Sequence, residues 1–130
     1  MQCYINQYSN INVTSKSSQL NNGTRTVTEN VADNNGISAS YKAWKQFKNT
    51  EKQNNILPGV SLDEEQLFYW SWAHIWCSAS RPNRYQNYTG RHSPRYARAI
   101  GSLQNNENFS KAFKCKSGSR MNPKNKCSLW

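Results

Sequence analysis

The sequence predicts a mainly α-helical protein whose core is incomplete. Two helix-start signals each precede a run of apolar residues at helical spacing. The length of 130 residues suits one small domain, but only 35% of the residues are hydrophobic, which leaves little core. Five Trp, seven Tyr and four Phe argue against a disordered chain, because aromatic side chains bury the most area.

The first half of the chain predicts a long helix after a polar segment. Residues 1–25 are rich in Asn, Ser and Thr and are expected to form strand or loop at the surface. Thr26 to Glu29 has the spacing of a capping box, so a helix is expected to begin near Thr26. Apolar residues then recur on one helix face, and they are Ile37, Tyr41, Trp44 and Phe47.

A second capping box, from Ser61 to Glu64, opens the most apolar segment. The helix is expected to run to Cys77 and to be apolar on nearly every side. Such a helix requires burial all round, which a chain of this composition does not supply. The apolar stretch 67–77 is too short to span a membrane, because a spanning helix needs about 20 residues.

Shorter elements are expected in the rest of the chain. Ser93 and Pro94 suit the N-cap and first position of a helix that ends near Gly101. Residues 106–113 predict a last short helix, and residues 118–130 an irregular tail. The fold class is therefore mainly α.

The positive charge is concentrated at one end. Lys and Arg number 17 against 7 Asp and Glu, a net charge of +10. Residues 1–80 are neutral overall, so the whole excess lies in residues 81–130. This pattern raises a polyanion-binding module as one hypothesis. The basic residues are spread singly and are not interleaved with the aromatics, so we expect no nucleic-acid partner.

Four cysteines and four glycosylation sequons indicate an oxidising compartment. The cysteines are widely spaced and neither His stands beside them at zinc-finger spacing, so disulfides are favoured over a structural metal site. No signal peptide precedes them, so we expect an extracellular protein whose N-terminal part is missing. The residues concerned are Cys3, Cys77, Cys115 and Cys127, and the sequon residues Asn12, Asn22, Asn87 and Asn108.

Two carboxylates and a His–Arg pair are the candidates for chemistry. Glu29 and Asp33 are four residues apart on a predicted helix, so both project from one face. They suit a metal ligand with a supporting acid or an acid–base pair, or else a capping acid and a solvated side chain. His92 and Arg98 can stabilise an oxyanion, although an isolated His in a basic loop is commonly solvated. His74 is expected to be a core histidine.

Residues 22–34, NGTRTVTENVADN, resemble the N-G-x-x-T-L-G-E-N-I-A-D-N segment of the neprilysin and endothelin-converting-enzyme family of zinc metallopeptidases. Further matches keep the order of that family and nearly its spacing, so that the resemblance covers nearly the whole chain. They are Leu57-Pro58-Gly59 with Glu65 to Phe68, Ile75-Trp76-Cys77 with Arg81-Pro82, His92-Ser93-Pro94 with Arg98, and Met121-Asn122-Pro123 with Lys126 to Trp130.

The resemblance implies a role for each matched residue. Glu29 corresponds to the third zinc ligand, beside two histidines of an H-E-x-x-H helix, and Asp33 to the carboxylate that orients one of those histidines. His92 corresponds to the histidine that stabilises the tetrahedral intermediate, and Arg98 to the arginine that binds a substrate carbonyl. The residues matched to the pocket for a large apolar substrate side chain are Ile75 and Trp76.

The resemblance also implies how the cysteines pair and where the protein acts. Cys3 and Cys127 correspond to a disulfide-bonded pair. Cys77 and Cys115 correspond to cysteines whose partners lie in an upstream lobe of the same enzyme. The implied cofactor is one zinc ion, the implied partners are peptide substrates, and the implied location is extracellular or the cell surface, with any membrane anchor upstream of this sequence.

The H-E-x-x-H motif itself is absent from the sequence, because neither His74 nor His92 belongs to one. Catalytic zinc needs three protein ligands, so the chain alone is expected not to hydrolyse peptides. Residues 1–130 are interpreted as the C-terminal segment of a zincin catalytic domain of the gluzincin type, incomplete on its own. The alternative is a truncated, non-catalytic secreted homologue that acts as a binding or decoy module.

Overall fold

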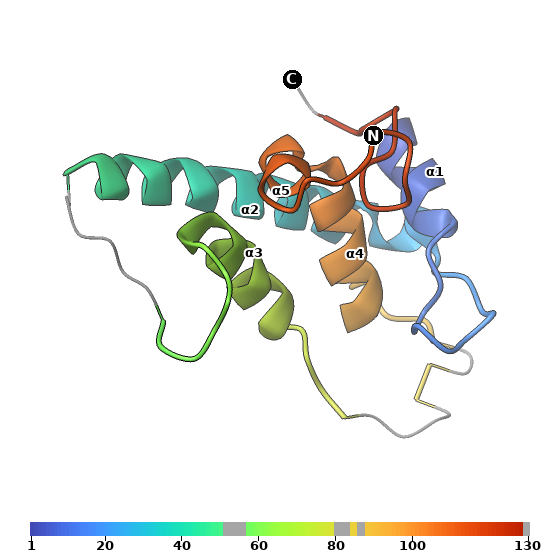
Figure 1. Ribbon diagram of the computed structural model, residues 1–130. Helices are drawn as coiled ribbons and strands as arrows, with labels where there is room; N and C mark the ends of the chain where they lie inside the picture. Colours follow the sequence, from blue (N-terminus) through green and yellow to red (C-terminus); the bar gives the residue numbers. More distant parts are fainter. Residues whose placement is uncertain (51–56, 80–83, 86–87, 129–130) are drawn as a thin grey trace.

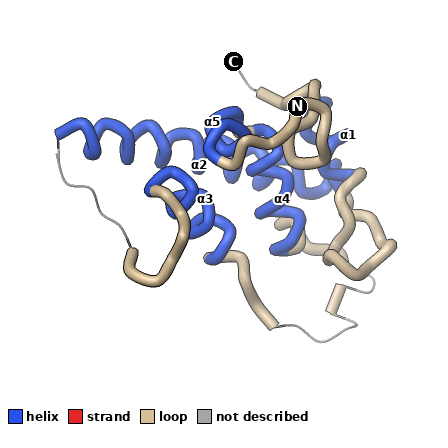
Figure 2. Tube along the Cα trace, viewed as in Figure 1, coloured by secondary structure: helices blue, strands red, loops and turns tan. Residues whose placement is uncertain are grey.

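The computed structural model describes residues 1–50, 57–79, 84–85 and 88–128, and it confirms the mainly helical prediction (Figure 1). Loops and turns connect the helices, and no strand occurs among these residues (Figure 2). None of the helices described has both the length and the apolar composition to cross a bilayer. The helices are α1 (Gln2–Ser9), α2 (Gly23–Thr50), α3 (Glu64–His74), α4 (Arg95–Asn105) and α5 (Glu107–Ala112).

The N-terminal segment forms helix α1, so the prediction of strand or loop there is wrong. Tyr4 and Tyr8 lie one turn apart and are both buried, in a cluster with residues of α4 and the C-terminal tail. A disulfide joins Cys3 to Cys127 with a Cα–Cα distance of 5.6 Å, as the resemblance implies. The polar composition of residues 1–25 as a whole hides this helical spacing in the sequence.

Helix α2 begins at Gly23, three residues before the predicted start. The Asn22 side chain caps it, because its Oδ1 accepts the backbone N–H of Arg25 at 3.0 Å. A Cβ atom on Gly23 would collide with the carbonyl oxygen of Ile5, so a glycine is needed where α1 crosses the start of α2. Thr26 is therefore not a cap, and its side chain is buried.

The second half of α2 packs through aromatic side chains. Tyr41 stacks on Tyr69 of α3 with ring centroids 5.4 Å apart, and Phe109 of α5 meets Tyr69 edge-on at 5.6 Å. We call this group the aromatic cluster, and its buried members are Ile37, Tyr41, Tyr69, Leu103 and Phe109. Phe47, the last residue of the predicted stripe, is exposed.

Helix α3 has a capping box that begins two residues later than predicted. Asp63, not Ser61, accepts the backbone N–H of Gln66 at 2.8 Å, and the Gln66 side chain accepts the Asp63 N–H at 3.2 Å. The helix ends at His74, before the predicted end at Cys77.

The α3 segment is not buried all round. Trp70 and Ile75 are exposed, and His74 is exposed and stacked on Trp70 rather than lying in the core. The Arg81-Pro82 pair falls outside the described residues.

Helix α4 continues to Asn105, past the predicted end at Gly101. Gly101 lies against the Tyr8 ring, and a Cβ atom there would collide with it, so close packing of α1 explains this glycine better than a helix end. The prediction of a last short helix is confirmed by α5, whose N-cap Asn106 accepts the backbone N–H of Phe109 at 3.0 Å. The tail after α5 is irregular, as predicted.

Candidate functional site

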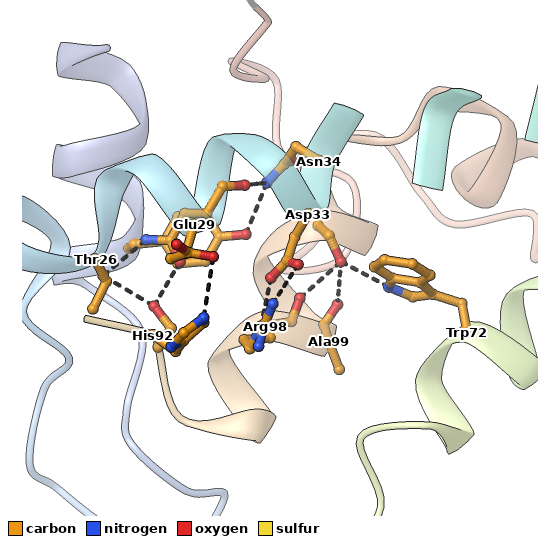
Figure 3. Close-up of polar contacts among 12 residues, drawn as sticks. Thr26, Glu29, Asp33, Asn34, Trp72, His92, Arg98 and Ala99 are labelled. Carbon is orange, nitrogen blue, oxygen red and sulfur yellow. Dashed lines mark hydrogen bonds and ion pairs between the residues drawn. The ribbon is translucent and has the colours of Figure 1, made fainter. Parts of the chain in front are cut away.

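The candidate site lies where one turn of α2 faces the loop before α4 and the first turn of α4 (Figure 3). Glu29 and Asp33 project from α2 toward this segment. The His92 Nε2 atom lies 3.1 Å from Glu29 Oε2, and the two side chains are 56% and 36% exposed. The carboxylate and the imidazole are therefore both open to solvent on one surface.

Asp33 and Arg98 form a bidentate ion pair. Arg98 Nε donates to Asp33 Oδ2 at 2.6 Å and Nη2 donates to Oδ1 at 2.7 Å. The side chains are only 18% exposed for Arg98 and 9% for Asp33. The hydrogen bonds that Arg98 donates to Asp33, with the negative charge of that carboxylate, raise the pKa of Arg98 above its ordinary value. The pair fixes α4 on α2 beside Glu29.

Trp76 supports the other side of Arg98. The Arg98 guanidinium carbon lies 4.1 Å from the centroid of the Trp76 ring, which is close for a cation–π contact. Trp76 also borders a cleft of about 510 Å³ between the end of α3 and the start of α4. Ile75 is exposed at the end of α3 and does not line this cleft. Of the two residues matched to the substrate pocket, only Trp76 joins the site cluster.

A buried network of hydrogen bonds lies behind the site, and no motif in the sequence predicted it. Ser93 Oγ donates to Asn30 Oδ1 at 2.6 Å and accepts from Asn21 Nδ2 at 2.9 Å. Asn30 Nδ2 donates to Thr26 Oγ1 at 2.9 Å. The one signal in the sequence was the spacing of residues 26, 30 and 34, which continues the buried face of the helix with polar side chains.

A second buried network joins α1, α2 and α4. Asn34 Nδ2 donates to Tyr8 Oη at 2.8 Å, and Asn105 Nδ2 donates to Asn34 Oδ1 at 2.8 Å. Burial raises the pKa of Tyr8 well above its ordinary value. The start of α2 is therefore held by directional bonds on the faces that it turns to α1 and α4.

The residues present provide only part of a zinc site. In the part of the chain that the structure describes, no three His, Cys, Asp or Glu side chains lie together so that they could hold a metal ion. The half-exposed carboxylate of Glu29 has the chemistry of one zinc ligand, but catalytic zinc requires three ligands from the protein. Glu29 therefore fits a zinc site that other residues must complete.

The remaining sequence-predicted residues lie apart from this cluster. Cys77 is exposed and Cys115 is half-buried, and both are free thiols. The sequon residue Asn22 is exposed, whereas Asn12 and Asn108 are half-buried and Asn87 lies outside the described residues.

Comparisons with known proteins match the whole chain. The family model described as Peptidase family M13 matches residues 1–129. Neprilysin of Oryctolagus cuniculus is 41% identical over 131 residues, which cover 99% of this chain and 18% of that protein. The endothelin-converting enzyme homolog of Locusta migratoria is 40% identical, with the same coverage. The chain thus spans about a fifth of the length of these relatives.

Solved structures agree with these matches. A chain of the "Haemonchus galactose containing glycoprotein complex" is similar with a TM-score of 0.83 and 29% identity over 98% of this chain and 23% of that chain. The zinc metalloprotease Zmp1 of Mycobacterium tuberculosis has the same fold, with a TM-score of 0.80 at 24% identity, over 99% of this chain and 21% of its own. The chain is thus a partial, helical domain of the zincin fold. It belongs to peptidase family M13, the family of neprilysin and the endothelin-converting enzymes.

Proposed function

We propose that residues 1–130 form the C-terminal part of the catalytic domain of a zinc-dependent metalloendopeptidase. One observation supports this most strongly. Glu29 and Asp33 of α2 pair with His92 and Arg98, which lie some sixty residues later in the sequence, on one side of that helix (Figure 3). In this proposal Glu29 is the third zinc ligand, and the other two belong to an H-E-x-x-H segment upstream.

His92 and Arg98 have distinct tasks in this proposal. Zinc, when bound, would polarise the peptide carbonyl and lower the pKa of a water molecule. The exposed His92 ring donates a hydrogen bond to the oxyanion that develops on that carbonyl. Arg98 uses Nε and Nη2 for Asp33, which leaves the Nη1 donors for a substrate carbonyl.

Asp33 can serve both Arg98 and a zinc-ligand histidine. A carboxylate has about four lone-pair positions, and the Arg98 pair uses two of them. One remaining position can accept the N–H of a histidine from the upstream segment, which would fix the tautomer of that histidine. This agrees with the role that the resemblance implies for Asp33.

Two apolar side chains and two free thiols fit an upstream lobe and a substrate pocket. Trp76 and Ile75 are proposed to line the pocket for a large apolar substrate side chain. Cys77 and Cys115 are free in this chain, as expected of thiols that pair with upstream cysteines. We propose an extracellular or cell-surface protein with glycans on the four sequons, attached to a membrane only through an upstream anchor.

The test begins with the transcript upstream of Met1. If it encodes an H-E-x-x-H motif, the longer protein is expressed and its hydrolysis of peptides with Phe or Leu after the scissile bond is measured. We expect turnover by the longer protein and none by residues 1–130 alone. His92→Ala should lower kcat by about 10²–10³-fold, the cost of losing one oxyanion donor. The exposed Arg91→Ala variant is the matched control and should retain activity.

A transcript that lacks the motif would overturn the enzyme proposal. The chain would then be a non-catalytic secreted homologue, and the surface around His92 would be its candidate binding surface.

A further inference from the structure

The His92 ring has little support of its own. It is 56% exposed, and in the described part of the chain its ion-pair partner is Glu29, whose Oε2 lies 3.1 Å from Nε2. An exposed pair of this kind is worth little, because water competes for both groups. The geometry of a catalytic group must nevertheless be held closely, since small displacements reduce the rate strongly. Some other contact has to fix the position of His92.

The next residue along the chain makes that contact. Ser93 is 3% exposed, and its hydroxyl lies within hydrogen-bond distance of three side chains from two separate segments. Helix α4 begins at Arg95, and its N-cap is Pro94 rather than the predicted Ser93; this cap makes no side-chain capping bond. Ser93 therefore ties the loop that carries His92 to the body of the protein.

Each hydroxyl has one proton to donate, and this determines the donor in each hydrogen bond of the network. Thr26 Oγ1 donates its proton to the carbonyl oxygen of Asn22 at 2.9 Å. Ser93 donates its single proton to Asn30 Oδ1, the shortest of its contacts at 2.6 Å, and accepts from Asn21 Nδ2. Ser93 is thus both a donor and an acceptor, and alanine would remove both bonds.

Two contacts run in parallel between the same two segments. Glu29 faces His92 at the surface, and Asn30 bonds to Ser93 in the interior, so each buried residue is the chain neighbour of a site residue. Asn30 is fully buried, which keeps water away from the inner bond. The inner bond therefore sets the separation of the two backbones, and the outer pair depends on it.

We infer that Ser93 is a positioning residue, which holds the imidazole of His92 against Glu29 by bonding to Asn30. The inference rests on the proposed role of His92 in the function above. It assigns Ser93 no contact with substrate.

The test measures the position of the His92 ring in the oxidised 130-residue chain by NMR. The readout is the nuclear Overhauser effect between the His92 ring protons and the Glu29 side-chain protons. Ser93→Ala should abolish it while the rest of the spectrum stays that of a folded protein. Ser93→Thr restores the hydroxyl and should restore the effect.

The matched control is Ser102→Ala. Ser102 is equally buried, and its hydroxyl bonds to the Arg98 carbonyl at 2.7 Å, remote from the His92 loop. Ser102→Ala should lower the free energy of unfolding but keep the nuclear Overhauser effect between His92 and Glu29. If Ser93→Ala does not fold, Ser93→Cys replaces it, because a thiol is a weak donor of similar shape, and it should weaken the effect.

The inference would be overturned if Ser93→Ala kept the full nuclear Overhauser effect between His92 and Glu29. It would also be overturned if Ser102→Ala lost this effect equally. Neither zinc nor turnover enters this readout. A failure of the proposed peptidase activity is therefore distinguishable from a failure of the positioning role.

Discussion

The two halves of helix α2 are held by different physical means. Around its first half the buried side chains are mainly amides, hydroxyls and one ion pair, among them Thr26, Asn30, Asp33 and Asn34. Around its second half the buried side chains belong to the aromatic cluster. One continuous helix thus joins a region of directional bonds to a region of apolar packing.

The difference shows where the fold needs defined geometry. Hydrogen bonds fix distance and angle, whereas apolar contacts tolerate small shifts, and the candidate site lies over the directional region. Among the described residues, the one buried side-chain nitrogen or oxygen without a hydrogen-bond partner is Trp76 Nε1, so the buried polar side chains of α2 are all paired. Apolar packing therefore dominates the aromatic region, whereas directional bonds define the geometry of the polar region.

Removing one partner of the buried ion pair should have the largest effect. Asp33→Ala leaves the Arg98 charge unpaired in a poorly solvated place, which costs about 3–5 kcal/mol of unfolding free energy. Chemical denaturation measures this cost. Asp33→Ala combined with Arg98→Met should recover much of the loss, and a double variant less stable than Asp33→Ala would contradict this account of the pair.

Truncation in the aromatic cluster should cost a similar amount for a different reason. Ile37 is fully buried there, so Ile37→Ala removes apolar contacts and leaves a cavity, at about 2–5 kcal/mol. Unlike Asp33→Ala, it should leave the His92–Glu29 contact unchanged by NMR. Loss of that contact would show that the two regions are not independent.

Buried tyrosines in both regions predict a loss of stability at alkaline pH. Burial raises the pKa of Tyr8 and of Tyr69 far above 10. The unfolded chain therefore releases these protons first, and the folded state holds more protons above pH 10. Stability should be constant below pH 10 and then fall by about 1.4 kcal/mol per pH unit for each such tyrosine.

Denaturant midpoints between pH 8 and pH 11 measure this slope. Tyr8→Phe and Tyr69→Phe should each reduce the slope of stability against pH by about 1.4 kcal/mol per pH unit. An unchanged slope in both variants would assign the alkaline loss to other groups.

The smallest effect is expected for the surface ion pair at the aromatic end. Lys45 Nζ and Glu65 Oε1 are 2.8 Å apart, but their side chains are 47% and 36% exposed. Glu65→Gln should cost about 0.2–1 kcal/mol, and the cost should fall in high salt. A cost as large as that of Asp33→Ala would remove the distinction between the buried pair and the exposed one.

Local patterns in the sequence predicted much of the fold. Helices α2 to α5 follow from apolar periodicity and capping residues. Helix α1 was missed because residues 1–25 are polar overall, and the burial of Tyr4 and Tyr8 depends on α4 and the tail. The helix propensity of the eight residues of α1 carries no information about partners so distant in the sequence.

The candidate site also has a part that was predicted from the sequence and a part that was not. The resemblance identified Glu29, Asp33, His92 and Arg98, and the structure brings these four together in two pairs. It did not identify Ser93 as more than a helix start, because its partner Asn30 lies 63 residues away in the sequence. A buried polar network is visible only when the segments that form it have been placed side by side.

The zinc content of the longer protein, measured with and without the Glu29 carboxylate, tests most directly whether α2 supplies a zinc ligand. We predict one zinc per wild-type chain and loss of that zinc in Glu29→Ala, while Glu107→Ala, which removes an exposed carboxylate on α5, retains it. Full zinc content in Glu29→Ala would contradict the claim that α2 completes the metal site.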